Sequence, residues 1–365
     1  MRLSPTSKLR AMLPRLVPRG SPSQLMRWGS PVLAVFLTIV TGLTVFALMG
    51  HDTGKAIHVF FILPVSDLYG ASELLVKATP LILCAIGLAI GFRANIWNIG
   101  AEGQLTVGAI AGGGLALAFF ESESALLLPA MCIAGMIGGF AWAAVPAFLK
   151  TRFGTNEILV SLMLTYVATL FLSYLVHGPL KDPDGYNFPE SRLFHDAALL
   201  PVVLDETRLH IGAVVTLFIV VAAWVMMART IIGYQIQVIG HAPGAAHYAG
   251  FSESKLIWLS LGIGGAFAGL AGTFEVAGPV GQLVPVISPG YGFTAIIVAF
   301  LGRLHPAGIV AAGLLMALSY LGGELAQMEM GMPSAVTGVF QGMLLFYLLA
   351  CDVLVGYKLK WGGTS

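Results

Sequence analysis

The sequence predicts an all-α membrane protein that crosses the bilayer many times. Of its 365 residues, 57% are hydrophobic and only 10% are charged, whereas soluble globular proteins carry about 25% charged residues. Glycine supplies 45 residues, nearly twice its usual share of about 7%, and this abundance suits closely packed transmembrane helices. A water-soluble core could not absorb so much apolar surface, so the soluble class is excluded.

Ten apolar runs approach the length of about 20 residues that a transmembrane helix needs. They lie at about 28–50, 74–92, 98–120, 125–149, 158–176, 209–228, 256–274, 286–302, 305–323 and 333–351. The second run is marginal because it contains Lys77 and Pro80. Five of the runs carry small-xxx-small pairs, which allow close approach of helix backbones. These pairs are Gly87/Gly91, Gly108/Gly112, Gly135/Gly139, Gly265/Gly269 and Gly338/Gly342.

Three prolines interrupt the uncharged stretch that follows the seventh run, at Pro279, Pro285 and Pro289. They predict a broken segment near 275–291 that dips into the membrane before the eighth run. Residues 288–302 weakly resemble residues 98–114, five runs earlier. An odd offset of this kind suggests a possible inverted 5+5 repeat, as in many transporters.

The charges predict the orientation and the boundaries of the membrane domain. With the N-terminus in the cytosol, the inner segments carry 14 of the 19 Lys and Arg residues, as the positive-inside rule requires. Residues 1–27 hold six of these and no acid, which predicts a basic cytosolic tail, with a transit peptide as the alternative. Residues 28–355 then form the membrane domain, and residues 356–365 form a cytosolic C-terminal tail, giving an N-in, C-in topology with ten spans.

The sequence lacks the common catalytic and nucleotide-binding motifs of enzymes. It has no GxxxxGK[ST], no GxGxxG after a strand, no HExxH and no GxSxG. Its three cysteines lie in or at the end of apolar runs, and its eight histidines are scattered without metal-ligand spacing. We therefore predict no catalytic residue, no metal and no cofactor, and do not expect an enzyme.

Polar residues at membrane depth are the best candidates for a functional site. Residues 91–105 read GFRANIWNIGAEGQL between two apolar runs, and each ionisable group there costs roughly 2.5–3.5 kcal/mol unless it has a partner. The predicted pathway residues are Asn95, Trp97, Asn98, Glu102, Gln104, Asn156, Glu157 and Glu275.

Structural roles compete with the pathway role for some of these residues. Asn156 and Glu157 follow Gly154 and Thr155, so they can instead cap the next helix. Glu102 lies in the first helical turn after a glycine. It can act as a structural pin by pairing with Arg93 or with helix N–H groups.

The inner loop 229–255 is long and amphipathic. Pro243 is suited to the first turn of a short helix, and Gly250 is suited to its end.

Four strings make the chain similar to the permease subunits of bacterial ABC importers of the simple-sugar and nucleoside group. They are FRAN with WNIGAEGQ at 92–104, GTNE at 154–157, the inner-loop residues from Gly233 to Gly250, and AFLGR at 299–303 followed by Pro306 and Gly308. The resemblance covers roughly residues 30–355. It is greatest to the nucleoside branch, whose binding proteins are lipoproteins of the outer face.

This resemblance implies function and partners that the residues alone do not. It implies ATP-driven import of nucleosides or related simple sugars across a bacterial cytoplasmic (inner) membrane. ATP hydrolysis would occur on a separate ATP-binding subunit, with a second, related permease chain and an extracytoplasmic solute-binding protein as further partners beside membrane lipid. The resemblance also implies that the residues coupling the permease to the ATPase are Gly233, Gly240, His241, Pro243, Ala245, Ala246 and Gly250. Gln237, Gly244 and His247 occupy positions where members of that family often have a basic residue.

A proton- or sodium-coupled secondary transporter is the alternative. Glu102, Glu157 and Glu275 would then form its relay, and the broken segment near 275–291 its site. A passive channel is disfavoured because no ring of like charges is evident.

Overall fold

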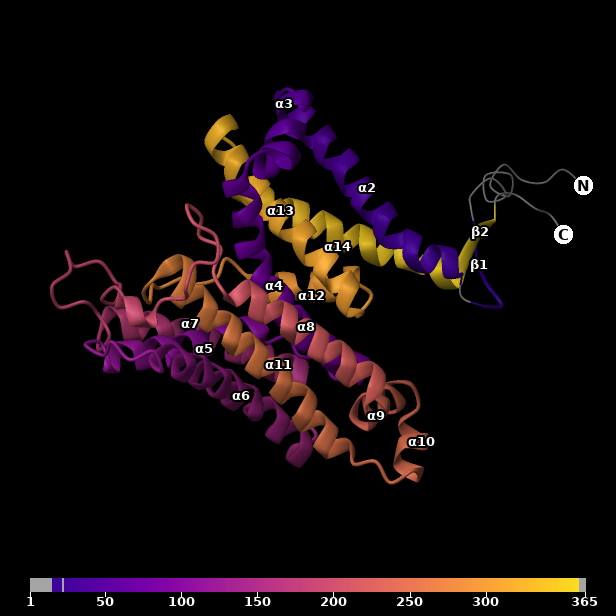
Figure 1. Ribbon diagram of the computed structural model, residues 1–365. Helices are drawn as coiled ribbons and strands as arrows, with labels where there is room; N and C mark the ends of the chain where they lie inside the picture. Colours follow the sequence, from indigo (N-terminus) through magenta and orange to yellow (C-terminus); the bar gives the residue numbers. More distant parts are fainter. Residues whose placement is uncertain (1–14, 22, 361–365) are drawn as a thin grey trace, which may run out of the picture. The chain divides into compact units, whose positions relative to one another are not determined.

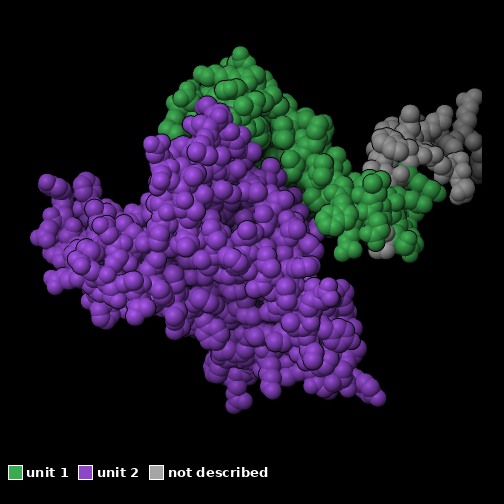
Figure 2. Space-filling view, in the orientation of Figure 1, with its two compact units in different colours: residues 1–62, 322–365 green, residues 63–321 purple. Residues whose placement is uncertain are grey.

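The computed structural model describes residues 15–21 and 23–360, which form two compact units. Unit 1 comprises residues 1–62 and 322–365, and unit 2 comprises residues 63–321 (Figure 2). Almost every described element is a helix (Figure 1). Residues 1–14 of the predicted basic tail and residues 361–365 of the C-terminal tail lie outside the described residues.

Eight helices in the described part of the chain are long and apolar enough to cross a membrane. They are α2 (Gln24–Leu48), α4 (Leu68–Arg93), α6 (Leu127–Phe153), α7 (Glu157–His177), α8 (Gly212–Arg229), α11 (Glu253–Glu275, continued by a π-helical turn Val276–Val280), α13 (Pro306–Met330) and α14 (Ala335–Gly356). The class of a multi-pass, nearly all-helical membrane protein is thereby confirmed.

The two remaining apolar runs also form helices, but these do not belong to the set of eight. Helix α5 (Ala101–Ala118) begins with a polar turn and is rich in glycine, and α12 (Tyr291–Leu301) has only 11 residues. All ten predicted runs thus coincide with helices, whereas the count of ten spans and the repeat stay predictions. The predicted break is present, because the chain is irregular from the π-helical turn to the start of α12.

The marginal rating of the second run was wrong. Helix α4 continues without interruption through Lys77 and Pro80. Of the residues in its most apolar stretch, 83% are buried. Packing on all sides stabilises this helix, and such packing outweighs the local penalty of a proline. Sequence composition alone does not reveal that neighbours surround it.

Unit 1 pairs the first and last long helices. A Cβ at Gly42 of α2 would overlap the ring of Phe340 of α14, and the Thr41 and Tyr347 hydroxyls are 2.8 Å apart. Strand β1 (Arg15–Pro18) pairs antiparallel with β2 (Tyr357–Lys360). The described parts of the two tails therefore lie together.

Unit 2 is built around glycine contacts between α11 and the helices α4, α5 and α6. A Cβ at Gly108 or Gly139 would overlap the backbone of α11, and one at Gly269 would overlap the carbonyl oxygen of Gly135. We call these four helices the glycine-packed block. Four of the predicted small-xxx-small pairs lie in it, whereas a Cβ added at Gly338 or Gly342 of the fifth pair would meet no neighbouring atom within 4 Å.

Three short elements complete the described chain of unit 2 between α7 and α11. A 3-10 turn, Asp196–Ala198, lies within the long connection from α7 to α8. Helices α9 (Ile231–His241) and α10 (Pro243–Tyr248) follow α8. Helix α3 (Thr53–Ile57) and a π-helical turn, His58–Ile62, belong to unit 1.

Candidate functional site: the junction of α4 and α5

Most predicted pathway residues meet at the segment that joins α4 to α5. Asn95 turns the chain with a φ of 58°, a left-handed conformation that asparagine tolerates better than most residues. Its side-chain oxygen accepts a hydrogen bond from the Trp97 indole at 3.1 Å. The Trp97 ring packs against Phe92 and stacks on Phe300, with centroids 5.1 and 5.7 Å away. The segment is thus fixed to both α4 and α12.

Asn98 and Gln104 form a closed pair of amides. Asn98 Nδ2 donates to Gln104 Oε1 at 2.8 Å, and Gln104 Nε2 donates to Asn98 Oδ1 at 3.1 Å. Asn98 Oδ1 also accepts from the Gly100 N–H at 3.0 Å. Both side chains are buried, and their mutual bonds offset the cost of burying amides. A solute could bind these amides only after the pair opened.

Glu102 caps the N-terminus of α12 from the first turn of α5. Its Oε2 accepts the Gly292 N–H at 2.6 Å, and Ser288 and Gly290 lie near the carboxylate. A Cβ at Gly292 would overlap the Glu102 backbone, so the two helix N-termini meet directly. Their positive ends attract a negative charge. The structure therefore shows the structural pin expected as one of two roles for Glu102.

Glu102→Ala is expected to destabilise unit 2 by about 1.5–3 kcal/mol, the usual loss for a hydrogen bond to a charged group. The physical reason is that the buried Gly292 N–H loses its acceptor. Thermal unfolding of the purified protein in detergent measures the effect. Glu253→Ala, at an exposed first-turn glutamate of α11, is the control, and equal melting temperatures for the two variants would contradict the pin.

Glu157 ties the start of α7 to its neighbours. Its Oε1 lies 2.5 Å from Lys150 Nζ of α6 and accepts the Trp97 N–H at 3.4 Å. Asn156 is the N-cap of α7, because its side chain accepts from the Ile158 N–H at 2.9 Å. The capping role is therefore the one shown for Asn156, and whether either residue borders a passage stays a prediction.

An open cavity of about 560 Å³ lies beside this ion pair, between the α6–α7 turn and the start of α11. Glu275 is remote from it, at the end of α11, and is buried. Among the described residues, Glu275 takes no part in the hydrogen bonds of the α4–α5 junction. The structure thus brings seven of the eight predicted pathway residues together at the junction, whereas Glu275 interacts electrostatically with Lys77, Arg208 and Glu102 without joining these hydrogen bonds.

The predicted coupling loop lies directly against the junction. Pro243 begins α10 and Gly250, with a φ of 77°, follows its end, as predicted. A Cβ at Gly240 would overlap the carbonyl oxygen of Arg93, the last residue of α4. At the other end of α9, Gly233 lies against the backbone of Met227.

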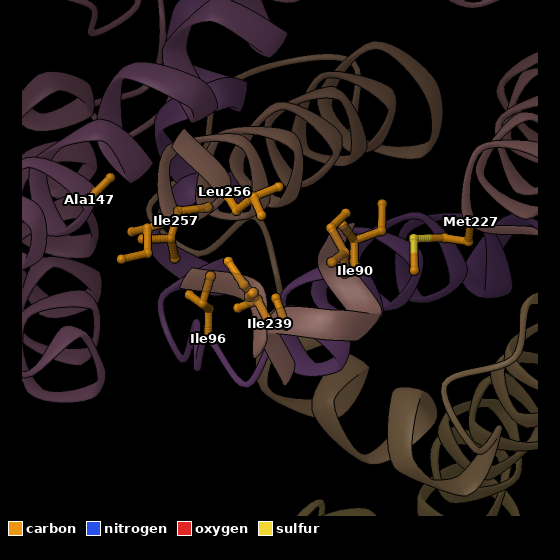
Figure 3. Packing of buried hydrophobic residues seen from close by; sticks show 11 residues of the cluster. Ile90, Ile96, Ala147, Met227, Ile239, Leu256 and Ile257 are labelled. Atoms are coloured by element: carbon orange, nitrogen blue, oxygen red, sulfur yellow. The ribbon is translucent and has the colours of Figure 1, made fainter. Parts of the chain in front are cut away.

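An apolar cluster fixes the coupling loop to the long helices (Figure 3). Ala246 of α10 is 1% exposed, and Ile239 of α9 packs with Ile90 of α4 and Leu256 of α11. His241 and Ala245 remain exposed on the other side of the loop. Helices α9 and α10 therefore have one face buried against the protein and one face exposed.

A second anchor, which the sequence did not predict, lies at the far end of α4. Arg208, in the connection before α8, makes a bidentate ion pair with Glu73, and this pair raises the pKa of the Arg208 guanidinium. Burial lowers the pKa of the nearby His210 to about 4, so its imidazole is neutral at pH 7. The His210 ring packs against Phe274 and occupies the space that a Cβ atom at Gly212 or Gly278 would need.

Other partners at the junction were also missed. Ser288 and Gly292 complete the Glu102 cap, Lys150 pairs with Glu157, and the Ser161 hydroxyl accepts the Ile99 N–H at 3.2 Å. The string Pro289–Gly290–Tyr291 marks the start of a half-helix, which was a usable signal for the cap. The other partners lie in distant elements and leave no local pattern.

Comparison with known proteins identifies the family. Residues 70–349 match the family model described as "Branched-chain amino acid transport system / permease component". The chain belongs to this permease family. The permease is 35% identical to the glucose ABC transporter permease protein TsgB13 of Haloferax volcanii, over 94% of this chain and 93% of that protein.

Two permease proteins of Bacillus subtilis are also similar to it. The guanosine ABC transporter permease protein NupP is 30% identical, over 92% of this chain and 97% of that protein. The guanosine ABC transporter permease protein NupQ is 28% identical, over 66% of this chain and 77% of that protein.

Proposed function

We propose that the permease is the membrane-spanning subunit of an ATP-driven importer for nucleosides or related simple sugars. It lies in the cytoplasmic membrane with both termini in the cytosol. A separate ATP-binding subunit, a second permease chain and an extracytoplasmic solute-binding protein complete the importer. The relatives that carry glucose or guanosine in their names support this solute class over branched-chain amino acids.

The contact between Gly240 and Arg93 carries the proposal. The short helices α9 and α10 pack there against the α4–α5 junction, where Asn98, Glu102 and Gln104 are buried. The chain has no phosphate-binding loop of its own, so the energy comes from outside it. The free faces of α9 and α10 are where the ATPase binds.

The geometry supports a transmission route from this loop to the broken segment. A shift of α9 pushes on the end of α4, and the α4–α5 segment passes the shift to α5. Glu102 then passes it to α12 through its hydrogen bond to Gly292. Alternation between inward-open and outward-open states requires ligands that bind the two states unequally, and ATP and the loaded binding protein supply that difference.

The solute passes between two related permease chains, lined on this chain by α4, α5, α7, α11 and α12. Similarity to two guanosine permease proteins of one bacterium supports such a pair. Trp97 offers an aromatic face to a base. The amides of Asn98 and Gln104 become available to ribose hydroxyls when their pair opens. No observation favours a proton- or sodium-coupled transporter, since the named relatives are ABC transporter permeases.

Uptake of labelled solutes by a deletion strain tests the function. We expect the deletion to abolish uptake of guanosine, other nucleosides or a simple sugar, and a plasmid copy to restore it. Leucine uptake serves as the control because it should not change. Loss of leucine uptake, with nucleoside and sugar uptake intact, would contradict the proposal.

A further inference from the structure

The connection from α7 to α8 is bound along its length to the broken segment that follows α11. Ser191 N–H donates to the Leu283 carbonyl at 2.9 Å, and Leu283 N–H donates to Ser191 Oγ at 2.9 Å. Phe194 N–H donates to Gly281, and Leu200 N–H donates to Ala277, both at 2.8 Å. We call residues 190–200 the strap. It runs beside the broken segment as a strand would run beside its neighbour.

Side chains reinforce the strap. Gln282 donates to the Glu190 carboxylate at 3.0 Å. Leu283, Ser191 and Phe194 are all buried. A Cβ at Gly113 of α5 would crowd both Leu283 and Phe194. A displacement of the strap therefore reaches the broken segment and α5 together.

The loop that precedes the strap exposes large apolar side chains. Tyr186 is 94% exposed, Phe188 is 64% exposed, and Leu193 within the strap is 68% exposed. We call residues 183–188 the tip. Ion pairs from Arg192 to Asp184 at 3.0 Å and to Asp182 at 3.5 Å fix its base, so the aromatic residues are presented on a constrained loop.

Charge around the tip indicates what kind of partner fits. Residues 178–211 contain six acidic residues and three Lys or Arg residues. Asp196, Asp205 and Glu206 are exposed and form no ion pair with the described residues. An aromatic centre with a charged rim is the usual anatomy of a protein interface, and this rim suits a partner that presents Lys or Arg.

We propose that the tip and the strap form the docking surface for the extracytoplasmic solute-binding protein, through a rim of that protein carrying Lys and Arg. The inference rests on the proposed function, which places this connection on the outer face of the membrane. Docking on the tip displaces the strap, and the strap moves the broken segment. Ser191 is a positioning residue for this transmission.

The experiment uses the complete complex of both permease chains and the ATPase in nanodiscs, with the purified solute-binding protein of the same importer. Tyr186→Ala with Phe188→Ala is expected to weaken binding of that protein by roughly tenfold or more, as loss of a central aromatic anchor does. Phe218→Ala removes a 71% exposed aromatic residue of α8 and should leave the affinity unchanged. Unchanged affinity of the tip variant, as expected if the tip contacts lipid instead, would overturn the docking surface.

Ser191 is tested by a different readout. Ser191→Ala removes the acceptor of the Leu283 N–H, so stimulation of ATP hydrolysis by the binding protein should fall while its affinity stays as in the wild type. Ser191→Thr keeps the hydroxyl and should restore the stimulation. Wild-type stimulation in Ser191→Ala would overturn the transmission. A wild-type complex that fails to transport would instead contradict the proposed function.

Discussion

Gly269→Ala is expected to disrupt the glycine-packed block and to cause a large loss of stability. The new Cβ would overlap the Gly135 carbonyl oxygen and would lie 3.0 Å from the Gly139 Cα. Both are backbone atoms, so no side chain can rotate away, and α6 must separate from α11. Overpacking of this kind costs about 1–3 kcal/mol, and more where the backbone must move.

The measurement is the melting temperature and the monodisperse yield of the detergent-purified permease. Gly114→Ala is the matched control, because it adds the same methyl group to α5 where no neighbouring atom lies within 4 Å. We expect the Gly114 variant to behave like the wild type. A Gly269 variant as stable as both would show that α6 and α11 do not approach as closely as described.

Gly240→Ala is expected to abolish transport while leaving membrane insertion intact. The added Cβ would overlap the Arg93 carbonyl oxygen and would lie 3.0 Å from the Arg93 carbonyl carbon, so α9 must lift away from the end of α4. The shift also disturbs the apolar cluster around Ile236 and Ile239, so we expect a modest loss of stability. It interrupts the route from the ATPase to the α4–α5 junction.

Nucleoside or sugar uptake and the amount of permease in the membrane fraction are measured together. Deletion of residues 240–250 should have the same effect, because it removes α10. Gly114→Ala again provides the control. Normal uptake by either the Gly240 variant or the deletion would show that coupling does not pass through this loop.

Composition and local pattern were sufficient for the class and for several elements. All ten apolar runs form helices, the prolines at 279, 285 and 289 mark a real break, and Pro243 begins α10. These features are local, since hydrophobic length, proline geometry and helix caps act within a few residues. The tolerance of α4 for Lys77 and Pro80 was not predictable in this way, because it depends on the surrounding helices.

Site residues were found more readily than their roles. Depth in the membrane correctly singled out Asn98, Glu102 and Gln104 as buried polar groups, but Asn98 and Gln104 satisfy each other. The partner of Glu102, Gly292, is 190 residues away. Long-range pairing of this kind leaves no periodic signal. The same limit applies to glycine motifs, because Gly265/Gly269 and Gly338/Gly342 look alike in the sequence while only the first pair meets other helices.

Accumulation of labelled solute in proteoliposomes tests most directly whether another polypeptide powers this chain. Vesicles containing both permease chains, the ATPase and the binding protein should concentrate a nucleoside or simple sugar only when ATP is supplied on the cytosolic side. Omission of the ATPase or of ATP should stop accumulation. Vesicles that hold this chain alone, and that still concentrate the solute under a proton or sodium gradient without nucleotide, would contradict an ATP-driven permease.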